Sequence, residues 1–278
     1  MPSTNGQGQH QHTATGIPQL KPQPFNTAWP EINELLTLKA GQVVVVAGPA
    51  STGKSFFSHT IAARAALIFG RGAGILSAEN DSLFVQQRLH AAECMIPIRA
   101  LTGAGSTDHH VDLLKAASDH LTRARILTSG EASIRPARLR AMLQRMLSEG
   151  WTPGIAVLDY YSALAEGVHS DVSEEALAAV AAQLPAIAEE YGITLFLATH
   201  LQHPFEDENP KPENIPVGAW RIADTVLMLR NNGTAPRRHI TVTVEKSADS
   251  RTGKSCDLHF DGWYGRFSST ALEGGPHL

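Results

Sequence analysis

The stretch Val43–Ser55, which reads Val-Val-Val-Val-Ala-Gly-Pro-Ala-Ser-Thr-Gly-Lys-Ser, decides the fold class of this chain of 278 residues. Its apolar first half predicts a buried strand, and its second half has the P-loop spacing Gly-x4-Gly-Lys-Ser. In such a loop backbone N–H groups wrap phosphates, Lys54 reaches the β- and γ-phosphate oxygens, and the Ser55 hydroxyl holds Mg²⁺. The alternative is a glycine turn with an incidental lysine, but a lysine at a buried corner needs an anion beside it. The expected nucleotide-binding residues, which run into a helix predicted over Phe56–Phe69, are Gly48, Pro49, Ala50, Ser51, Thr52, Gly53, Lys54, Ser55 and Phe56.

A glutamate follows the second predicted strand. The short apolar run Gly74–Ala78 is followed by Glu79, Asn80 and Asp81. We expect Asn80 or Asp81 to cap a helix over Ser82–Ala92, which leaves Glu79 at the carboxyl end of the strand, where open α/β sheets bind ligands. A glutamate there can orient and polarise the water that attacks a γ-phosphate. A solvated carboxylate at a helix start is the alternative, and the neighbouring P-loop favours the catalytic interpretation.

Two more predicted strands end in polar side chains. Gly154–Asp159 is a hydrophobic run that closes on an acid. In a P-loop protein such an aspartate lies beside Ser55 and holds Mg²⁺ directly or through water. The run Ile193–His200 ends in a histidine that could hydrogen-bond the γ-phosphate and respond to its presence. The alternative for His200 is a strand-end histidine bonded to the backbone.

The composition is that of an ordinary globular protein, with 42% hydrophobic residues and a formal net charge of −4 at pH 7. No apolar run approaches the roughly 20 residues of a membrane span, and the N-terminus lacks the pattern of a secretory signal. The two cysteines, Cys94 and Cys256, do not indicate a disulfide framework. We therefore expect a cytoplasmic protein without membrane contact, in which any binding of nucleic acid depends on local loops rather than on net charge.

The predicted organisation is one α/β domain over residues 25–268, between a disordered or extended tail at 1–24 and a flexible tail at 269–278. The order of elements predicts a mostly parallel twisted sheet flanked by helices, with a C-terminal antiparallel hairpin. The remaining predicted helices are Trp29–Leu38, Val111–Leu121, Arg135–Ser148 and Glu174–Tyr191, the last interrupted near Pro185. The remaining predicted strands are Ala124–Thr128, Asp224–Arg230, His239–Glu245 and Cys256–Phe260. Loops or turns are predicted over Ile96–Asp108, Ser162–Val172, Leu201–Val217 and Lys246–Gly253.

From about Leu38 to Phe267 the order of motifs resembles the RecA-like core of DnaB-type and plasmid RepA-type hexameric replicative helicases. Four segments are similar in type to that family: Ser77–Glu79 at its catalytic glutamate, Leu158–Tyr160 at its magnesium aspartate, Ala223–Arg230, and Phe260–Phe267 at its closing strand. The resemblance implies a RecA-like P-loop NTPase core that hydrolyses ATP with Mg²⁺, assembles as a hexameric ring and acts on single-stranded DNA. It also implies that Arg230 lies against the adenine.

The C-terminal hairpin departs from the family pattern. Helicases of this type place a lysine and, two residues later, an arginine finger in this hairpin, where both reach the ATP of the neighbouring subunit. Lys246 fits the lysine, whereas Ala248 occupies the arginine position. Arg251 in the same turn could reach the γ-phosphate of a neighbour instead, and a solvated turn residue is the alternative. His200 resembles the RepA-like members, because the DnaB type usually carries glutamine there.

Two loops that the resemblance places along a DNA channel are acidic. Their charged residues are Glu166, Asp171, Glu174 and Glu175 in the first loop, and Glu206, Asp207, Glu208, Glu213 and Lys211 in the second. Acidic loops repel the phosphates of DNA, so the electrostatic attraction that supports most such binding is missing. Two functions therefore stay open. The first is an ATP-driven hexameric DNA helicase in replication; the alternative is a RecA-like ATPase switch that acts as a loader or recombination mediator through a protein partner.

Overall fold

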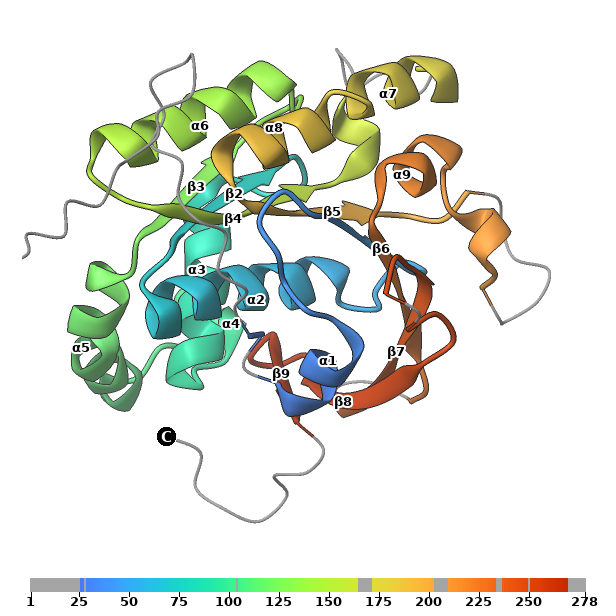
Figure 1. Cartoon of the computed structure of the whole chain (residues 1–278). Helices are drawn as coiled ribbons and strands as arrows, with labels where there is room; N and C mark the ends of the chain where they lie inside the picture. Colours follow the sequence, from blue (N-terminus) through green and yellow to red (C-terminus); the bar gives the residue numbers. More distant parts are fainter. Residues whose placement is uncertain are drawn as a thin grey trace, which may run out of the picture.

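A central β-sheet organises the computed structural model, which describes residues 26–27, 29–103, 105–164, 172–202, 210–233, 237–249 and 251–269 (Figure 1). Among these residues the sheet has nine strands in the order β3-β2-β4-β5-β1-β6-β7-β8-β9. Neighbours from β3 to β6 in this order run parallel, whereas β7, β8 and β9 join antiparallel. The strands are β1 Val43–Ala47, β2 Gly72–Ser77, β3 Ile126–Gly130, β4 Pro153–Asp159, β5 Thr194–Thr199, β6 Thr225–Asn231, β7 Arg237–Ser247, β8 Ser255–Asp261 and β9 Arg266–Ser269.

This architecture confirms the predicted α/β fold with a mostly parallel sheet. The C-terminal addition contains one strand more than the predicted hairpin, because β9 pairs with β8 after a turn. The predicted tails at 1–24 and 269–278 lie outside the described residues, apart from Ser269.

Helices cover both faces of the parallel strands (Figure 1). α1, α2 and α3 lie on one face, and α6, α7, α8 and α9 lie on the other. The helices are α1 Pro30–Leu35, α2 Lys54–Phe69, α3 Ser82–Cys94, α4 Ile98–Leu101, α5 Asp108–Arg123, α6 Pro136–Ser148, α7 Glu174–Ala181, α8 Leu184–Tyr191 and α9 Val217–Ile222. No helix in the described part of the chain is long and apolar enough to cross a membrane.

The valines of β1 supply both cores, because successive side chains of a strand point to opposite faces. Val44 and Val46 pack in the core with α2, and Val43 and Val45 pack in the core with α8. All four side chains are 0% exposed. Burial on both faces is the physical reason why this strand has no polar residue.

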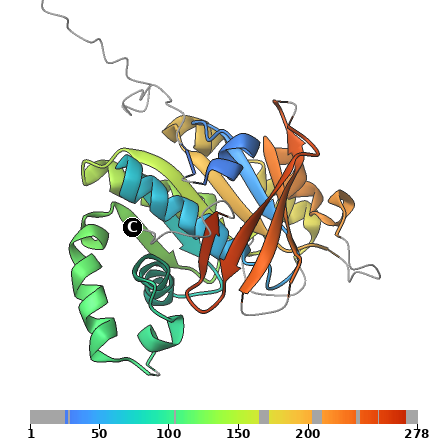
Figure 2. The same ribbon diagram turned by 90° about the horizontal axis from the view of Figure 1, so that it is seen from below.

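An aromatic cluster joins the two ends of the described chain. Trp29, at the start of α1, stacks on Phe57 of α2 with ring centroids 5.5 Å apart, and lies 6.1 Å from the ring of Phe267 in β9. Phe57 and Phe267 are 5.6 Å apart. Figure 2 shows α1 (blue) beside β8 and β9 (red). The cluster therefore holds the P-loop helix against the C-terminal strands.

Several predicted boundaries are wrong where an adjoining element extends further than the local pattern indicates. α5 continues to Arg123, so β3 begins at Ile126 rather than at Ala124. β7 continues to Ser247, because Ser247 pairs with Thr225 of β6. The predicted loops also contain short elements, namely α4, the start of α9 and two 3-10 turns at Tyr161–Leu164 and Pro212–Asn214.

The interruption predicted at Pro185 is confirmed. α7 ends at Ala181 and α8 starts at Leu184, so Pro185 falls in the first turn of the second helix, where its missing N–H is tolerated.

Candidate active site

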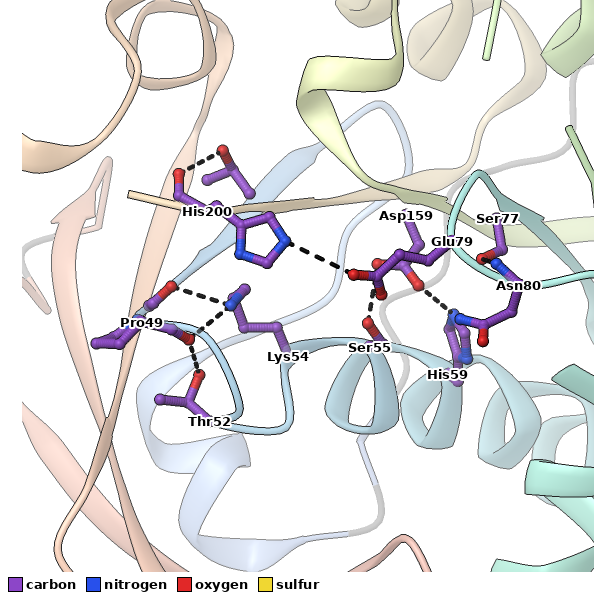
Figure 3. A network of polar contacts seen from close by, with 12 residues as sticks. Pro49, Thr52, Lys54, Ser55, His59, Ser77, Glu79, Asn80, Asp159 and His200 are labelled. Carbon is purple, nitrogen blue, oxygen red and sulfur yellow. Dashed lines mark hydrogen bonds and ion pairs between the residues drawn. The ribbon is translucent and has the colours of Figure 1, made fainter. Parts of the chain in front are cut away.

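The carboxyl ends of four neighbouring parallel strands form one edge of the sheet, in the order β2-β4-β5-β1. Ala47 of β1 pairs with Thr199 of β5, Ala198 of β5 pairs with Asp159 of β4, and Asp159 pairs with Ser77 of β2. The residues that follow these positions come from distant parts of the sequence, yet they lie together at this edge (Figure 3). We call this group the carboxyl-edge site.

Two glycines shape the P-loop between β1 and α2. A Cβ on Gly48 would lie 2.6 Å from the carbonyl oxygen of Leu229, so no other residue fits there without displacement. Gly53 has a φ of 86°, the left-handed conformation that favours glycine, and it caps α2 without a side-chain hydrogen bond. The first N–H groups of α2 are therefore not used by a capping side chain, which is the arrangement that binds phosphate. Ala50 and Ser51 are exposed at the tip of the loop.

Lys54 is buried inside the loop. Its Nζ donates to the carbonyl oxygens of Gly48 at 3.0 Å and Pro49 at 2.7 Å, and the residue is 6% exposed. Burial lowers the pKa of Lys54 to about 8, although the carboxylates of Asp159 and Glu79 act in the opposite direction. A buried ammonium group whose hydrogen bonds go to carbonyls gains strongly from an anion, so Lys54 suits a phosphate.

Ser55 and Asp159 converge from α2 and the end of β4. The Ser55 hydroxyl donates to Oδ1 of Asp159 at 3.0 Å, and Nε2 of His59 lies 3.3 Å from Oδ2 (Figure 3). Burial acts to raise the pKa of Asp159, but His59, the Ser55 hydroxyl and the Arg88 guanidinium outweigh it, so the pKa lies below its usual value. Asp159 is therefore a carboxylate at neutral pH despite being 1% exposed.

These oxygen atoms fit Mg²⁺. A serine hydroxyl and a carboxylate are hard donors of the kind that Mg²⁺ prefers, and Mg²⁺ usually takes only one or two carboxylates and completes its shell with phosphate and water. Within the described ranges no cluster of three or more His, Cys, Asp or Glu side chains could hold a metal. Ser55 and Asp159 would hold the ion, which when bound neutralises charge on the phosphates.

Glu79 lies two residues beyond β2, on the same edge. The neighbouring Ala78 N–H donates to the Asp159 carbonyl at 2.7 Å, and this bond ties the ends of the two strands together. Asp81 caps α3 by accepting from the Phe84 N–H at 2.7 Å, as one of the two predicted alternatives states. The Glu79 carboxylate is not used as a cap, and its side chain is 47% exposed.

His200 faces Glu79 from the end of β5. Its Nε2 lies 3.9 Å from Oε1 of Glu79 (Figure 3). Its ring lies edge-on to that of Tyr160, with the ring centroids 5.1 Å apart. Burial lowers the pKa of His200, and the positive charge of Lys54 adds to this effect. The imidazole is therefore neutral at physiological pH and able to donate a single hydrogen bond from each tautomer.

Arg230 lies at the carboxyl end of β6, next to β1. It donates to Oε1 of Glu245 at 2.7 Å and to the carbonyl of Pro210 at 2.9 Å. The structure thus brings Arg230 to the same edge as the P-loop, in an intrachain ion pair.

Lys246 and Arg251 do not join the carboxyl-edge site of their own chain. β7 is antiparallel, so Lys246 pairs with Val226 near the start of β6, and its Nζ donates to the Trp220 carbonyl at 2.9 Å. Arg251 donates to the Thr37 hydroxyl at 2.9 Å, ahead of β1, and lies 3.4 Å from Asp249. Both cations therefore lie toward the opposite edge of the sheet, so any role in catalysis would concern the site of another subunit.

Three residues at the site were missed from the sequence. Arg238 of β7 donates to the Ser51 carbonyl at 2.9 Å, and the guanidinium carbon of Arg88 lies 4.6 Å from the centroid of the Phe56 ring. The ring of Phe56 is thereby engaged in packing, so a nucleotide contact by Phe56 would have to come from its backbone N–H. The third residue is His59, and it alone had a sequence signal, since it follows Ser55 by four positions and so shares its helix face.

Comparisons with known proteins agree with this arrangement. The replicative DNA helicase DnaB of Helicobacter pylori is 22% identical over 171 residues, which cover 62% of this chain and 35% of the relative. The chain therefore spans about a third of that protein's length.

Solved structures share the fold at low identity. A DnaB-like replicative helicase, described with its interactions with primase, superposes with a TM-score of 0.77 at 16% identity, over 88% of this chain and 61% of the other. A second solved structure, of an ATPase domain, has a TM-score of 0.72 at 16% identity, with coverages of 82% and 84%. A KaiC-like protein of Pyrococcus horikoshii has a TM-score of 0.59 at 15% identity, with coverages of 89% and 98%.

The family assignment rests on most of the chain rather than on the P-loop alone. Residues 25–269 match the model of the DnaB-like helicase C terminal domain, and the chain therefore belongs to that family.

Proposed function

We propose that this chain is the motor domain of an ATP-hydrolysing, hexameric DNA helicase that acts in replication. One observation carries the proposal: five polar side chains from four separate stretches of sequence lie together at one edge of the sheet (Figure 3). They are Lys54, Ser55, Glu79, Asp159 and His200. Membership of the DnaB-like helicase C-terminal family supports it. The motor domain extends over residues 25–268 in this proposal.

Each of these residues has one role. Lys54 and the N–H groups of the P-loop bind the β- and γ-phosphates of ATP, and Ser55 and Asp159 hold Mg²⁺. Glu79 orients and polarises the attacking water, for which its exposed and uncapped carboxylate is suited. His200 contacts the γ-phosphate as a neutral hydrogen-bond donor. Arg230 lies against the adenine.

Lys246 and Arg251 act on the ATP of a neighbouring subunit. Their place toward the opposite edge of the sheet excludes their own site and suits a ring in which that edge faces the next P-loop. Arg251 replaces the arginine that the family has at the position of Ala248 and stabilises charge in the transition state.

The partners of the motor follow from the same reasoning. The chain forms a homo-oligomeric ring on single-stranded DNA in the cytoplasm, and a replication protein docks on that ring. One solved relative is described with primase, which makes primase the first candidate. Because the loops at 165–175 and 202–217 are acidic, backbone N–H groups carry much of the DNA contact.

The decisive experiment is the steady-state ATPase rate with and without single-stranded DNA, at low and moderate salt, together with the mass of the protein in solution. Strong stimulation by DNA and a mass near six subunits support the motor. A slow rate that DNA does not change, from a monomer or dimer, would contradict it and favour an ATPase switch that acts through a protein partner.

A further inference from the structure

His59 occupies an unusual place for a histidine. It lies on α2 one turn after Ser55, and its side chain is only 2% exposed. Its Nε2 lies 3.3 Å from Oδ2 of Asp159, whose side chain is also 2% exposed. Both ring nitrogens are buried and neither makes a hydrogen bond among the described residues, so Nε2 meets Oδ2 at ion-pair distance. A polar ring is buried in this way only if a strong interaction offsets its lost hydration, and the Asp159 carboxylate is the charged group beside it.

The two oxygens of Asp159 face different partners. Oδ1 accepts from the Ser55 hydroxyl at 3.0 Å, whereas Oδ2 faces His59 (Figure 3). Ser55 and His59 are four residues apart on one helix, so the same face of α2 contacts both oxygens. The carboxyl plane is therefore held at two points by a rigid element.

We propose that His59 is a positioning residue for the magnesium site. Its Nε2 lies against Oδ2 of Asp159 and thereby keeps Oδ1 beside the Ser55 hydroxyl, where these two oxygens would hold the ion. The inference rests on the proposed nucleotide site, but not on helicase activity or on assembly of a ring.

General chemistry supports this role. Partners that hydrogen-bond the ligands of a metal fix the orientation of those ligands, and their loss typically weakens metal binding by about 10- to 100-fold. Without the His59 contact, the Asp159 carboxylate would be held only by its hydrogen bond from Ser55 and could rotate more freely. If the histidine only filled space, replacing it would not weaken the binding of Mg²⁺.

The experiment measures binding of a fluorescent ADP to the full chain, once in excess EDTA and once across a titration of Mg²⁺. The variants are His59→Leu, which removes the donor, and His59→Gln, which places an N–H donor near the position of Nε2. Ser58→Ala is the matched control, because Ser58 is equally buried on the same helix and its hydroxyl has no hydrogen-bond partner in the described structure. Thermal unfolding of each variant without nucleotide reports on folding.

We expect H59L to raise, by about tenfold, the Mg²⁺ concentration at which half of the Mg²⁺-dependent increase in ADP binding is reached. ADP binding in EDTA should not change. H59Q stays within about threefold of the unsubstituted chain, and S58A does not differ from it. Equal effects of H59L and S58A would overturn the inference, as would an equal loss of binding with and without Mg²⁺. If H59L does not fold, His59→Asn, whose donor is too short to reach, is compared with H59Q. Absence of any Mg²⁺-dependent binding by the unsubstituted chain would instead overturn the proposed function.

Discussion

The charged groups in the two halves of the sheet differ in how completely they are paired. At the carboxyl-edge site, charges are buried and incompletely matched: Lys54 bonds to carbonyls, and Oδ2 of Asp159 and Nδ1 of His59 are buried without a hydrogen bond. In the C-terminal part of the sheet, from β6 onward, three arginines already have acidic partners. These pairs are Arg230 with Glu245, Arg237 with Asp261, and Arg251 with Asp249.

This difference indicates which region gains most from a ligand. Burying a polar group without a partner costs free energy, so in the proposed function a nucleotide with Mg²⁺ would stabilise the carboxyl-edge site by supplying partners for Lys54 and Asp159. A cation in the C-terminal part of the sheet can act on a neighbouring subunit only by exchanging its intrachain partner for a phosphate, which reduces the net effect.

The largest expected effect tests the first half of this comparison. Lys54→Ala removes the cation that faces the phosphates, and we expect the ATPase kcat/KM to fall by about 1,000-fold, since charge stabilisation is usually the largest catalytic contribution. Lys39→Ala is the control, because Lys39 is exposed and its hydrogen bonds are made by its backbone. A rate unchanged by K54A would rule out the site.

Glu79→Gln separates binding from chemistry at the same edge. Glutamine keeps the size of the side chain but cannot accept a proton, so we expect kcat to fall by about 100-fold while ATP binding is retained. Single-turnover hydrolysis and equilibrium binding of a fluorescent ATP analogue measure the two effects. Survival of turnover would place the catalytic base elsewhere.

Arg251→Ala tests the second half of the comparison. We expect a loss of about tenfold in the ATPase rate of the assembled protein, well below the roughly 1,000-fold typical of an arginine finger, because Lys246 still supplies charge and Arg251 must first leave Thr37. Dilute subunits should show no loss. Arg237→Ala is the matched control, because that arginine lies on β7, the strand that leads into the turn with Arg251, and its side chain is 82% exposed. An equal loss in assembled and dilute protein would contradict action on a neighbour.

The smallest expected effect is that of His200 on how the thermal stability of the chain depends on pH. Its pKa is lowered in the folded chain, first by burial and then by Lys54, so the unfolded chain binds more protons as the pH falls below the ordinary value of 6.5. His200 therefore adds stability above that pH, and this stability is lost as the pH falls through its lowered pKa. His200→Gln should reduce the drop in Tm between pH 7.5 and 5.5 by about 1 °C, a small effect because the side chain is 44% exposed. The exposed His109→Gln should leave the drop unchanged.

Much of the fold and the centre of the site could be predicted, because the evidence is local. The valine run before Gly48 and the apolar runs before Glu79, Asp159 and His200 each predict a buried strand. Parallel strands joined by helices bring their carboxyl ends to one edge, so these four groups were expected to meet. Element ends were less predictable, since β3 begins and β7 ends where pairing with the neighbouring strand begins or ends.

The sequence by itself determined that this chain has a P-loop α/β core with two carboxylates and a histidine at its strand ends, because local periodicity and spacing carry that information. Only the tertiary structure decided that His59 contacts Asp159 and that Arg238 contacts Ser51. It also decided that Lys246 and Arg251 lie away from the P-loop of their own chain. These contacts join residues more than 20 positions apart. Their geometry follows from how helices pack on the sheet and how an added antiparallel strand reverses its ends, which no local pattern specifies.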